Sequence, residues 1–273
     1  MENILNLSVL GHDVRAMHIP NTGKPVMVFL MGSLQDIEGV GQFSDGFSPY
    51  FDYWAVELPG FGKTQPLHSK FGVPFIAECL AVFVEEYVGS SFNLVACSYA
   101  TAIALDYAKL HQNRLENMVL VGSMMDIPLS HWPTMLQLLR DVSFDPPKFA
   151  SGFVDLLTVD HPDIPRQAAI RRAATRRAKV DGENLWHFVF NTIRLMSFNV
   201  GDLSGITVPT LVYTGEHDPY VTPDDAKKLA QALPNAEFQI LPGCDHLFFL
   251  EKPLESIAMV NQFLARRTEM VAA

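Results

Sequence analysis

Short apolar runs alternate along this chain with segments in which apolar residues recur every three or four positions. Continuous apolar runs are typical of strands buried on both faces, whereas the wider spacing is typical of helices that bury one face. The pattern predicts strands at residues 4–10, 13–19, 25–30, 53–58, 92–97 and 118–122, and within 207–218 and 236–246. It predicts helices at 41–50, 73–88, from Ala100 onward, at 223–233 and at 253–266.

Strands that alternate with helices are typical of the α/β class. Crossovers between parallel strands are right-handed, so we expect a mainly parallel sheet that carries helices on both faces. The first two strands meet at Gly11 and His12 and are expected to form a hairpin at a sheet edge. Ligands of such sheets bind at the carboxyl ends of the strands, and the functional site is expected there.

The alternation stops between residues 126 and 200, where helical spacing continues without convincing strands. We interpret this stretch as a helical insert that lies over the site as a lid or cap. Residues 1–125 and 201–273 would then form the core. With 273 residues, of which 48% are hydrophobic, the chain can bury one substantial core of this kind.

Composition narrows the class of function. The formal net charge of −10 argues against broad nucleic-acid binding, because phosphates would be repelled. Three scattered cysteines predict neither a disulfide framework nor a zinc site, and no His-Glu-x-x-His motif is present, so we expect no metal and no cofactor. Charged residues interrupt the first twenty positions and no run reaches transmembrane length, which favours a cytoplasmic protein without a membrane span.

The apolar run at residues 92–97 ends at Ser98 and continues directly into the helix that begins near Ala100. A serine at a sharp turn between a strand and a helix is typical of a nucleophile elbow, in which the residues two before and two after must be small. Ala96 and Ala100 meet that requirement. A serine at a helix start is also a common N-cap, so the motif alone is weak.

Chain order strengthens the prediction, because Asp218 and His246 follow the predicted strands within 207–218 and 236–246. Nucleophile, acid and base then occur in the order Ser, Asp, His, each beyond the carboxyl end of a strand. Asp126, which follows the strand at 118–122, is an alternative acid. His217 is an alternative imidazole, although it is adjacent to Asp218 and one loop cannot easily supply both partners.

Several further motifs share one resemblance. They are Leu30-Met-Gly-Ser33, Glu57-Leu-Pro-Gly-Phe-Gly62, the Ser98 turn, Gly215-Glu-His-Asp218, Gly243-Cys-Asp-His246 and Leu250-Glu-Lys-Pro253. Over nearly its whole length the chain resembles the α/β-hydrolase superfamily. Within it, the chain is similar to bacterial enzymes that act on 3-hydroxyacyl chains of acyl carrier protein, of the rhamnolipid-precursor synthase and 3-hydroxyacyl transacylase type. They share a Gly-x-x-Asp-x-Tyr pattern, here Gly215, Asp218 and Tyr220.

The resemblance implies an eight-stranded sheet, a helical lid and an oxyanion hole formed by the backbone N–H groups of Ser33 and Tyr99. Met31 replaces the usual histidine, and alanines replace the elbow glycines, but the backbone donors remain. It implies a serine hydrolase that cleaves carboxylic esters or thioesters through an acyl-Ser98 intermediate. Alternatives are an acyltransferase that uses 3-hydroxyacyl carrier protein or acyl-coenzyme A, a C–C bond hydrolase or perhydrolase, and a non-catalytic relative.

Substrate choice is expected to depend on the insert and nearby loops, because flexible thioethers and flat rings accommodate an alkyl chain. The predicted pocket residues are Leu34, Met124, Met125, Trp132, Met135, Phe153, Trp186, Phe190 and Leu247. Ordinary core packing is the alternative for each of them. The segment from Arg166 to Lys179 contains six basic residues and no acid. Its Arg171, Arg172, Arg176 and Arg177 form either a solvated helix face or a docking site for an acidic carrier protein or coenzyme A.

Overall fold

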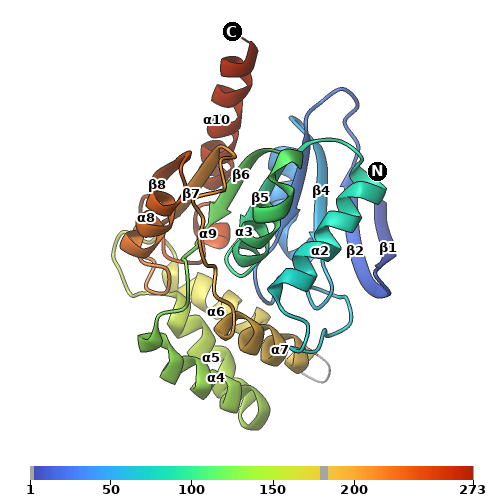
Figure 1. Ribbon diagram of the computed structural model, residues 1–273. Helices are drawn as coiled ribbons and strands as arrows, with labels where there is room; N and C mark the ends of the chain where they lie inside the picture. Colours follow the sequence, from blue (N-terminus) through green and yellow to red (C-terminus); the bar gives the residue numbers. More distant parts are fainter. Residues whose placement is uncertain (1–2, 179–183, 273) are drawn as a thin grey trace.

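One eight-stranded sheet runs through the computed structural model, which describes residues 3–178 and 184–272 (Figure 1). The strands are β1 (Asn3–Val9), β2 (His12–Ile19), β3 (Val26–Leu30), β4 (Asp52–Glu57), β5 (Phe92–Cys97), β6 (Leu115–Val121), β7 (Thr210–Gly215) and β8 (Ala236–Leu241). Their order is β1-β2-β4-β3-β5-β6-β7-β8. Only the pairings that involve β1 or β2 are antiparallel among these strands, which confirms the predicted α/β fold and the edge hairpin.

Helices cover both faces of the sheet. One face packs against α2 (Val73–Phe83), α3 (Ala100–His111) and α8 (Pro223–Ala232), and the other against α1 (Gly41–Phe47) and α10 (Pro253–Ala272). Side chains of β5 alternate between these two cores, with Leu94 and Ala96 on the first and Val95 and Cys97 on the second. All of β5 is therefore buried, which explains why its sequence is a continuous apolar run.

The connections contain the remaining short elements. A π-helical turn at Val84–Val88 extends α2, three 3₁₀ turns lie at Ile37–Val40, Gln112–Arg114 and Leu129–His131, and α9 (Phe248–Glu251) precedes α10. None of the helices in residues 3–178 and 184–272 combines the length and the apolar character that a membrane span requires.

Four helices separate β6 from β7, namely α4 (Trp132–Phe144), α5 (Pro146–Leu157), α6 (Gln167–Arg177) and α7 (Asn184–Met196). We call them the helical layer. In Figure 1 they lie below the sheet, at the end toward which β6 points, and α4 contacts α5 and α7 while α5 contacts α6. No strand forms in the described part of residues 126–200, as the sequence predicts.

The helical layer is attached to the core through buried polar contacts of α7. Arg194 is 2% exposed and donates hydrogen bonds of 2.6, 2.7 and 3.3 Å to carbonyl oxygens in the segment 67–71. His187 Nδ1 and Asn191 Nδ2 each donate a 2.9 Å hydrogen bond to the carbonyl oxygen of Gly60. Unpaired buried carbonyls are costly, so these bonds fix α7 to the loop that follows β4.

Candidate active site

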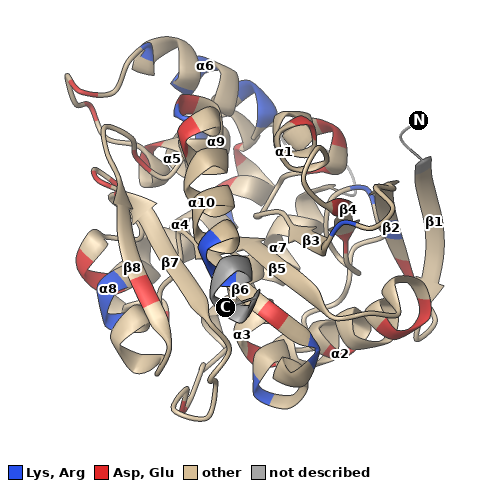
Figure 2. Ribbon diagram, turned by 90° about the horizontal axis from the view of Figure 1, so that it is seen from above, with Lys and Arg blue, Asp and Glu red and all other residues tan. Residues whose placement is uncertain are grey.

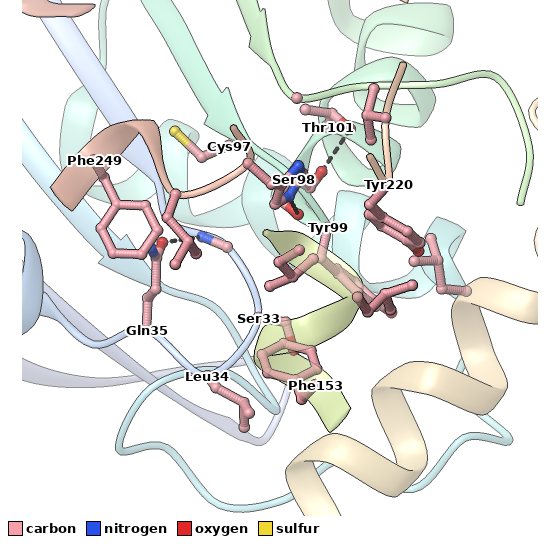
Figure 3. Close-up of a pocket in the computed structure, with 18 of the residues that line it drawn as sticks. Ser33, Leu34, Gln35, Cys97, Ser98, Tyr99, Thr101, Phe153, Tyr220 and Phe249 are labelled. Carbon is pink, nitrogen blue, oxygen red and sulfur yellow. Dashed lines mark hydrogen bonds between the residues drawn. The ribbon is translucent and has the colours of Figure 1, made fainter. Parts of the chain in front are cut away.

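Ser98 occupies the turn between β5 and α3 and has a φ of +51°. Such a positive value is strained for a residue with a side chain, and it persists here because both sides of the turn are fixed. Ser98 N donates a 2.7 Å hydrogen bond to Val121 O, and Thr101 Oγ1 donates a 2.6 Å bond to Ser98 O. Ala96 and Ala100 are fully buried, as a tight elbow requires. The Ser98 hydroxyl therefore lies at the carboxyl end of the sheet (Figure 3).

His246 lies in the loop that follows β8, and its side chain contacts Ser98. Its Nε2 lies 2.9 Å from Ser98 Oγ, and the residue is only 4% exposed. Gly122, with a φ of +58°, makes room for the ring, because a Cβ at that position would lie 2.9 Å from His246 Cε1. The close approach of this glycine sets the position of the imidazole.

Asp218 follows β7 and completes a chain of hydrogen bonds. Its Oδ2 lies 2.7 Å from His246 Nδ1 and accepts a 2.8 Å bond from Thr214 Oγ1. Its Oδ1 accepts backbone N–H bonds from Tyr220 at 2.9 Å and Val221 at 2.8 Å. Because four donors surround it, the carboxylate of Asp218 is held in a single orientation and its oxygens are paired, although the residue is 3% exposed.

The electrostatics define which nitrogen of His246 carries the proton. Nδ1 faces the Asp218 carboxylate and donates to it, so Nε2 is free to accept the Ser98 hydroxyl proton. Burial by itself lowers the pKa of His246, but the carboxylate of Asp218, with Asp245 nearby, outweighs burial and raises that pKa above its ordinary value. The imidazole is consequently a stronger base than a free histidine.

Asp126 and His217, the alternatives for the acid and the base, make other contacts. Asp126 is exposed, and its Oδ1 accepts a 3.2 Å hydrogen bond from Val200 N. His217 stacks on the ring of His161 with centroids 3.7 Å apart. The residues that the structure brings into hydrogen-bond contact with Ser98 and with each other are therefore His246 and Asp218.

A cavity of about 480 Å³ opens beside Ser98 and His246. Six of the nine predicted pocket residues line it: Leu34, Met124, Met125, Met135, Phe153 and Leu247. Lining residues that sequence reasoning left out include Val154, Leu157, Leu195, Phe198, Tyr220 and Phe249. Figure 3 shows Leu34, Phe153, Tyr220 and Phe249 around this space. The lining is predominantly apolar, which suits a hydrocarbon group next to the serine.

Three predicted pocket residues do not line the cavity, and their assignment to it is corrected here. Trp132 is 36% exposed and Trp186 is 48% exposed. Trp186 stacks on Phe190, whose ring also lies 4.9 Å from that of His68. α7 turns Phe188 toward the cavity instead. Helical spacing predicts an apolar stripe but does not say which neighbour that stripe faces, and these rings lie on the outer side.

Ser33 and Tyr99, the predicted oxyanion donors, both line the cavity next to Ser98 (Figure 3). The loop after β3 passes close to the serine, because a Cβ on Gly32 would lie 3.3 Å from Ser98 Cβ. Gly32 N donates a 2.7 Å hydrogen bond to Gln35 Oε1, and Leu34 has a φ of +57°. The loop is therefore held in a strained conformation beside the hydroxyl.

The predicted basic run forms most of α6, whose arginines are among the blue segments of Figure 2. Arg172, Arg176 and Arg177 are exposed, and Arg177 also lines the cavity. Arg171 is paired with Asp155 on α5. Lys179, the last basic residue of the run, lies outside the described residues.

Comparisons with known proteins agree with this architecture. A family model described as the alpha/beta hydrolase family matches residues 36–260. The chain is 24% identical over 233 residues to pimeloyl-[acyl-carrier protein] methyl ester esterase of Serratia marcescens, covering 80% of this chain and 86% of that one. It is 21% identical over 261 residues to poly(3-hydroxyalkanoate) depolymerase of Ectopseudomonas oleovorans, covering 90% of this chain and 88% of that one.

Among solved structures, the enol-lactonase of Burkholderia xenovorans LB400 superposes with a TM-score of 0.84 at 16% identity, over 96% of this chain and 100% of that one. Identity this low shows the shared fold and nothing finer. The family match covers well over half of the chain, and the sheet order and the strand-end loops fit it. This protein belongs to the α/β hydrolase family, and its relatives include esterases.

Proposed function

We propose that this protein is a serine hydrolase that cleaves carboxylic esters or thioesters of an apolar acyl group through an acyl-Ser98 intermediate. The observation that carries the proposal is the continuous hydrogen-bonded chain from Ser98 through His246 to Asp218, which opens on an apolar cavity. A hydrolase fold alone would not choose among chemistries, because function resides in the site.

The reaction follows from the proton positions. As Ser98 Oγ attacks the acyl carbonyl, its proton passes to His246 Nε2, and Asp218 stabilises the imidazolium that forms. His246 then donates that proton to the leaving alkoxide or thiolate, which leaves an ester on Ser98. A water molecule, deprotonated by the same nitrogen, attacks this ester and releases the acid, and the proton returns to Ser98.

Charge on the carbonyl oxygen needs separate stabilisation. We assign this role to the backbone N–H groups of Ser33 and Tyr99, which lie in the loops on either side of Ser98 in the cavity lining. One such donor contributes about 3 kcal/mol of transition-state stabilisation. Because the donors belong to the backbone, the side chains at these positions and at Met31 can vary without removing them.

The helical layer is proposed to act as the lid that shapes the acyl site over the core formed by residues 1–125 and 201–273. Met135, Phe153 and Phe188 come from α4, α5 and α7 and meet the core residues of the cavity. The relatives named above as an acyl-carrier-protein methyl ester esterase and a polyhydroxyalkanoate depolymerase both act on esters. Their names and the apolar lining both favour an acyl ester over a sugar or a charged substrate.

We further propose that the acyl group is presented on an acidic carrier. Arg172, Arg176 and Arg177 are exposed on α6, and Arg177 reaches the cavity lining, so they lie where a carrier would meet the cavity. Guanidinium groups bind carboxylates and phosphates in bidentate fashion and steer charged partners. The esterase relative named for a carrier-linked substrate supports this choice.

Covalent labelling tests the proposal directly. A fluorophosphonate probe should label the protein, and Ser98→Ala should abolish both labelling and the hydrolysis of a medium-chain p-nitrophenyl ester, while circular dichroism shows an intact fold. Ser8→Ala, in edge strand β1, is the matched control and should be labelled normally. Labelling that persists in Ser98→Ala would overturn the assignment of the nucleophile.

Product analysis then separates hydrolysis from transfer. Free acid from ester, acyl-coenzyme A and 3-hydroxyacyl carrier protein supports the proposal, whereas an ester of two hydroxyacids would show an acyltransferase. For the carrier, Arg172 and Arg176 changed together to Gln should raise the KM for carrier-linked substrate about tenfold and leave hydrolysis of the p-nitrophenyl ester unaffected. An unchanged KM for the carrier-linked substrate would disprove docking on α6.

A further inference from the structure

Two histidines and an aspartate from distant parts of the chain meet beside the loop that carries Asp218. His161 and Asp163 lie in the connection between α5 and α6, and His217 follows β7. One ligating atom of each residue lies within 4.8 Å of those of the other two. His161 and Asp163 are close in sequence but His217 is distant from both, so the group exists only because the fold brings these two loops together.

The separations are those of ligands around one ion rather than of direct hydrogen bonds. His217 Nε2 and His161 Nδ1 each lie 3.7 Å from Asp163 Oδ2, beyond hydrogen-bond distance. Two ligands bound at 2.0–2.1 Å around a tetrahedral zinc ion are about 3.3 Å apart. A shift of a few tenths of an ångström would therefore bring the Asp163 carboxylate to ligand spacing from each ring.

The ring nitrogens of the two histidines differ in the contacts that they make. His217 Nε2 is buried, and none of the described residues hydrogen-bonds to it, which is unusual for a buried polar atom. His161 Nδ1 accepts a 3.3 Å hydrogen bond from Asp163 N, and a bound metal ion would replace this bond. The two rings stack with centroids 3.7 Å apart and planes at 28°, which holds the two loops against each other.

We propose that His161, Asp163 and His217 bind a divalent transition-metal ion of the Zn²⁺ class. Imidazole and carboxylate ligands match this class. Glu216 lies beside these three ligands and adds a second carboxylate, because its Oε2 lies 3.8 Å from His217 Nε2 and accepts a 2.9 Å bond from Gly243 N. The site contains two carboxylates and two imidazoles that are neutral when bound, so a divalent ion leaves it uncharged.

Binding would connect the helical layer to the core on the side away from the α7 contacts. The α5–α6 connection leads into the arginine-bearing helix, and His217 is adjacent in sequence to Asp218. The proposed ligands are distinct from Ser98, His246 and Asp218, so the role proposed for the metal is structural. This inference is independent of the proposed reaction.

The test uses the full chain, treated with chelator and dialysed, and titrated with Zn²⁺ alone. We expect one Zn²⁺ per chain by calorimetry, and a melting temperature that rises by about 5 °C when free Zn²⁺ exceeds Kd a hundredfold. Affinity should fall in acid, because protons compete for ligand imidazoles.

Two variants probe the ligands. Asp163→Asn changes a side chain that is 66% exposed, which leaves folding intact, and should weaken binding at least tenfold; His217→Ala should abolish it. His111→Ala is the matched control, because His111 Nε2 also lies 3.7 Å from a carboxylate, that of Glu78. This variant should bind Zn²⁺ as tightly as the wild type. Absence of saturable Zn²⁺ binding in the wild type would overturn the proposal. Binding in Asp163→Asn and His217→Ala that is as tight as in the wild type would also overturn it.

Discussion

The strand-end loops and the helical layer solve different physical problems at the same cavity. Ser98, His246 and Asp218 are connected by hydrogen bonds of 2.9 and 2.7 Å, and Asp218 is bound to two backbone amides. The layer contributes side chains such as Met135 and Phe153, which make apolar contacts without defined direction. Proton transfer needs fixed atoms, whereas an alkyl chain needs only a dry surface of suitable shape.

The two regions also differ in what positions them. The strand ends next to Ser98 and Asp218 belong to β5 and β7, which are buried along their whole length, so their geometry follows from the core. The layer depends on a few buried polar contacts of α7, chiefly those of Arg194. We therefore expect changes in the first region to lower turnover and changes in the second to lower stability.

The largest expected effect is on turnover. Asp218→Asn places an amide beside His246 Nδ1 and removes the charge that stabilises the imidazolium, so kcat should fall about 10⁴-fold. Burial then acts on His246 without its counter-charge, and the pKa of His246 falls. The acid limb of the residual activity should move to lower pH. Ester hydrolysis across pH, with circular dichroism as a check of folding, measures both effects.

Asp126→Asn is the matched control, because Asp126 also lines the cavity but is exposed and bonded to Val200 N. It should keep activity within about twofold of the wild type, since exposed substitutions seldom matter. Should Asp126→Asn cost as much as Asp218→Asn, the assignment of the acid would be wrong.

The next effect is on stability. Arg194→Met removes three hydrogen bonds to carbonyl oxygens of the segment 67–71 and leaves them buried. The free energy of unfolding should fall by about 3 kcal/mol, the cost expected for unpaired buried acceptors. Urea denaturation measures it. Arg172→Met, which changes an exposed arginine of the same layer, should cost less than about 0.5 kcal/mol. Equal losses would show that α7 is not specifically fixed by Arg194.

The same contrast explains how much the sequence could predict. Apolar runs predict the central strands because burial on both faces leaves a continuous pattern; Ser98 directly follows β5, and Asp218 and His246 lie in the loops after β7 and β8. The spacing in residues 126–200 predicts helices correctly, but the pocket predicted from the same stretch includes Trp132, Trp186 and Phe190, which do not line the cavity. Periodicity identifies a stripe, and only the packing of one helix on another decides what the stripe faces.

Polar contacts between remote segments were not predictable for a related reason. Arg194 sits in an amphipathic helix, where an arginine normally indicates the solvent face, yet it is 2% exposed. His161 and His217 are 56 positions apart, and the sequence around them does not indicate that their rings stack. Their contacts depend on how the layer docks on the core, which neither composition nor spacing encodes.

A smaller effect tests the fit of His246 against the end of β6. Gly122→Ala introduces a Cβ 2.9 Å from His246 Cε1, so the ring must move and kcat should fall about 10- to 100-fold. Gly201→Ala is the matched control, since its φ of +64° is similar but the nearest atoms are 4.0 Å away. Both should lose about 1 kcal/mol of stability from the left-handed backbone. Activity assays and urea denaturation of the two variants separate backbone strain from displacement of the His246 ring. Equal losses of kcat in both variants would show that the contact with His246 is not the cause.

The smallest effect concerns Glu251 in α9, the short helix that packs against α6. Glu251 Oε2 accepts a 2.8 Å bond from Asp245 N, and burial together with the charge of Asp245 raises the pKa of Glu251 to about 7. Between the ordinary carboxyl pKa and about 7, the folded state keeps a proton that the unfolded chain has lost. The free energy of unfolding should therefore decrease as pH rises through this window.

Glu251→Gln removes that proton linkage while its amide oxygen can still accept from Asp245 N. Relative to the wild type, the variant should gain stability between pH 4.5 and pH 8, by about 1 kcal/mol after allowance for solvent screening of a partly exposed group. Urea denaturation at both pH values measures the difference. Glu255→Gln, in the exposed first turn of α10, controls for the loss of one negative charge. A gain of the same size there would assign the effect to net charge, and the contact at α9 would then be no more sensitive to pH than the surface.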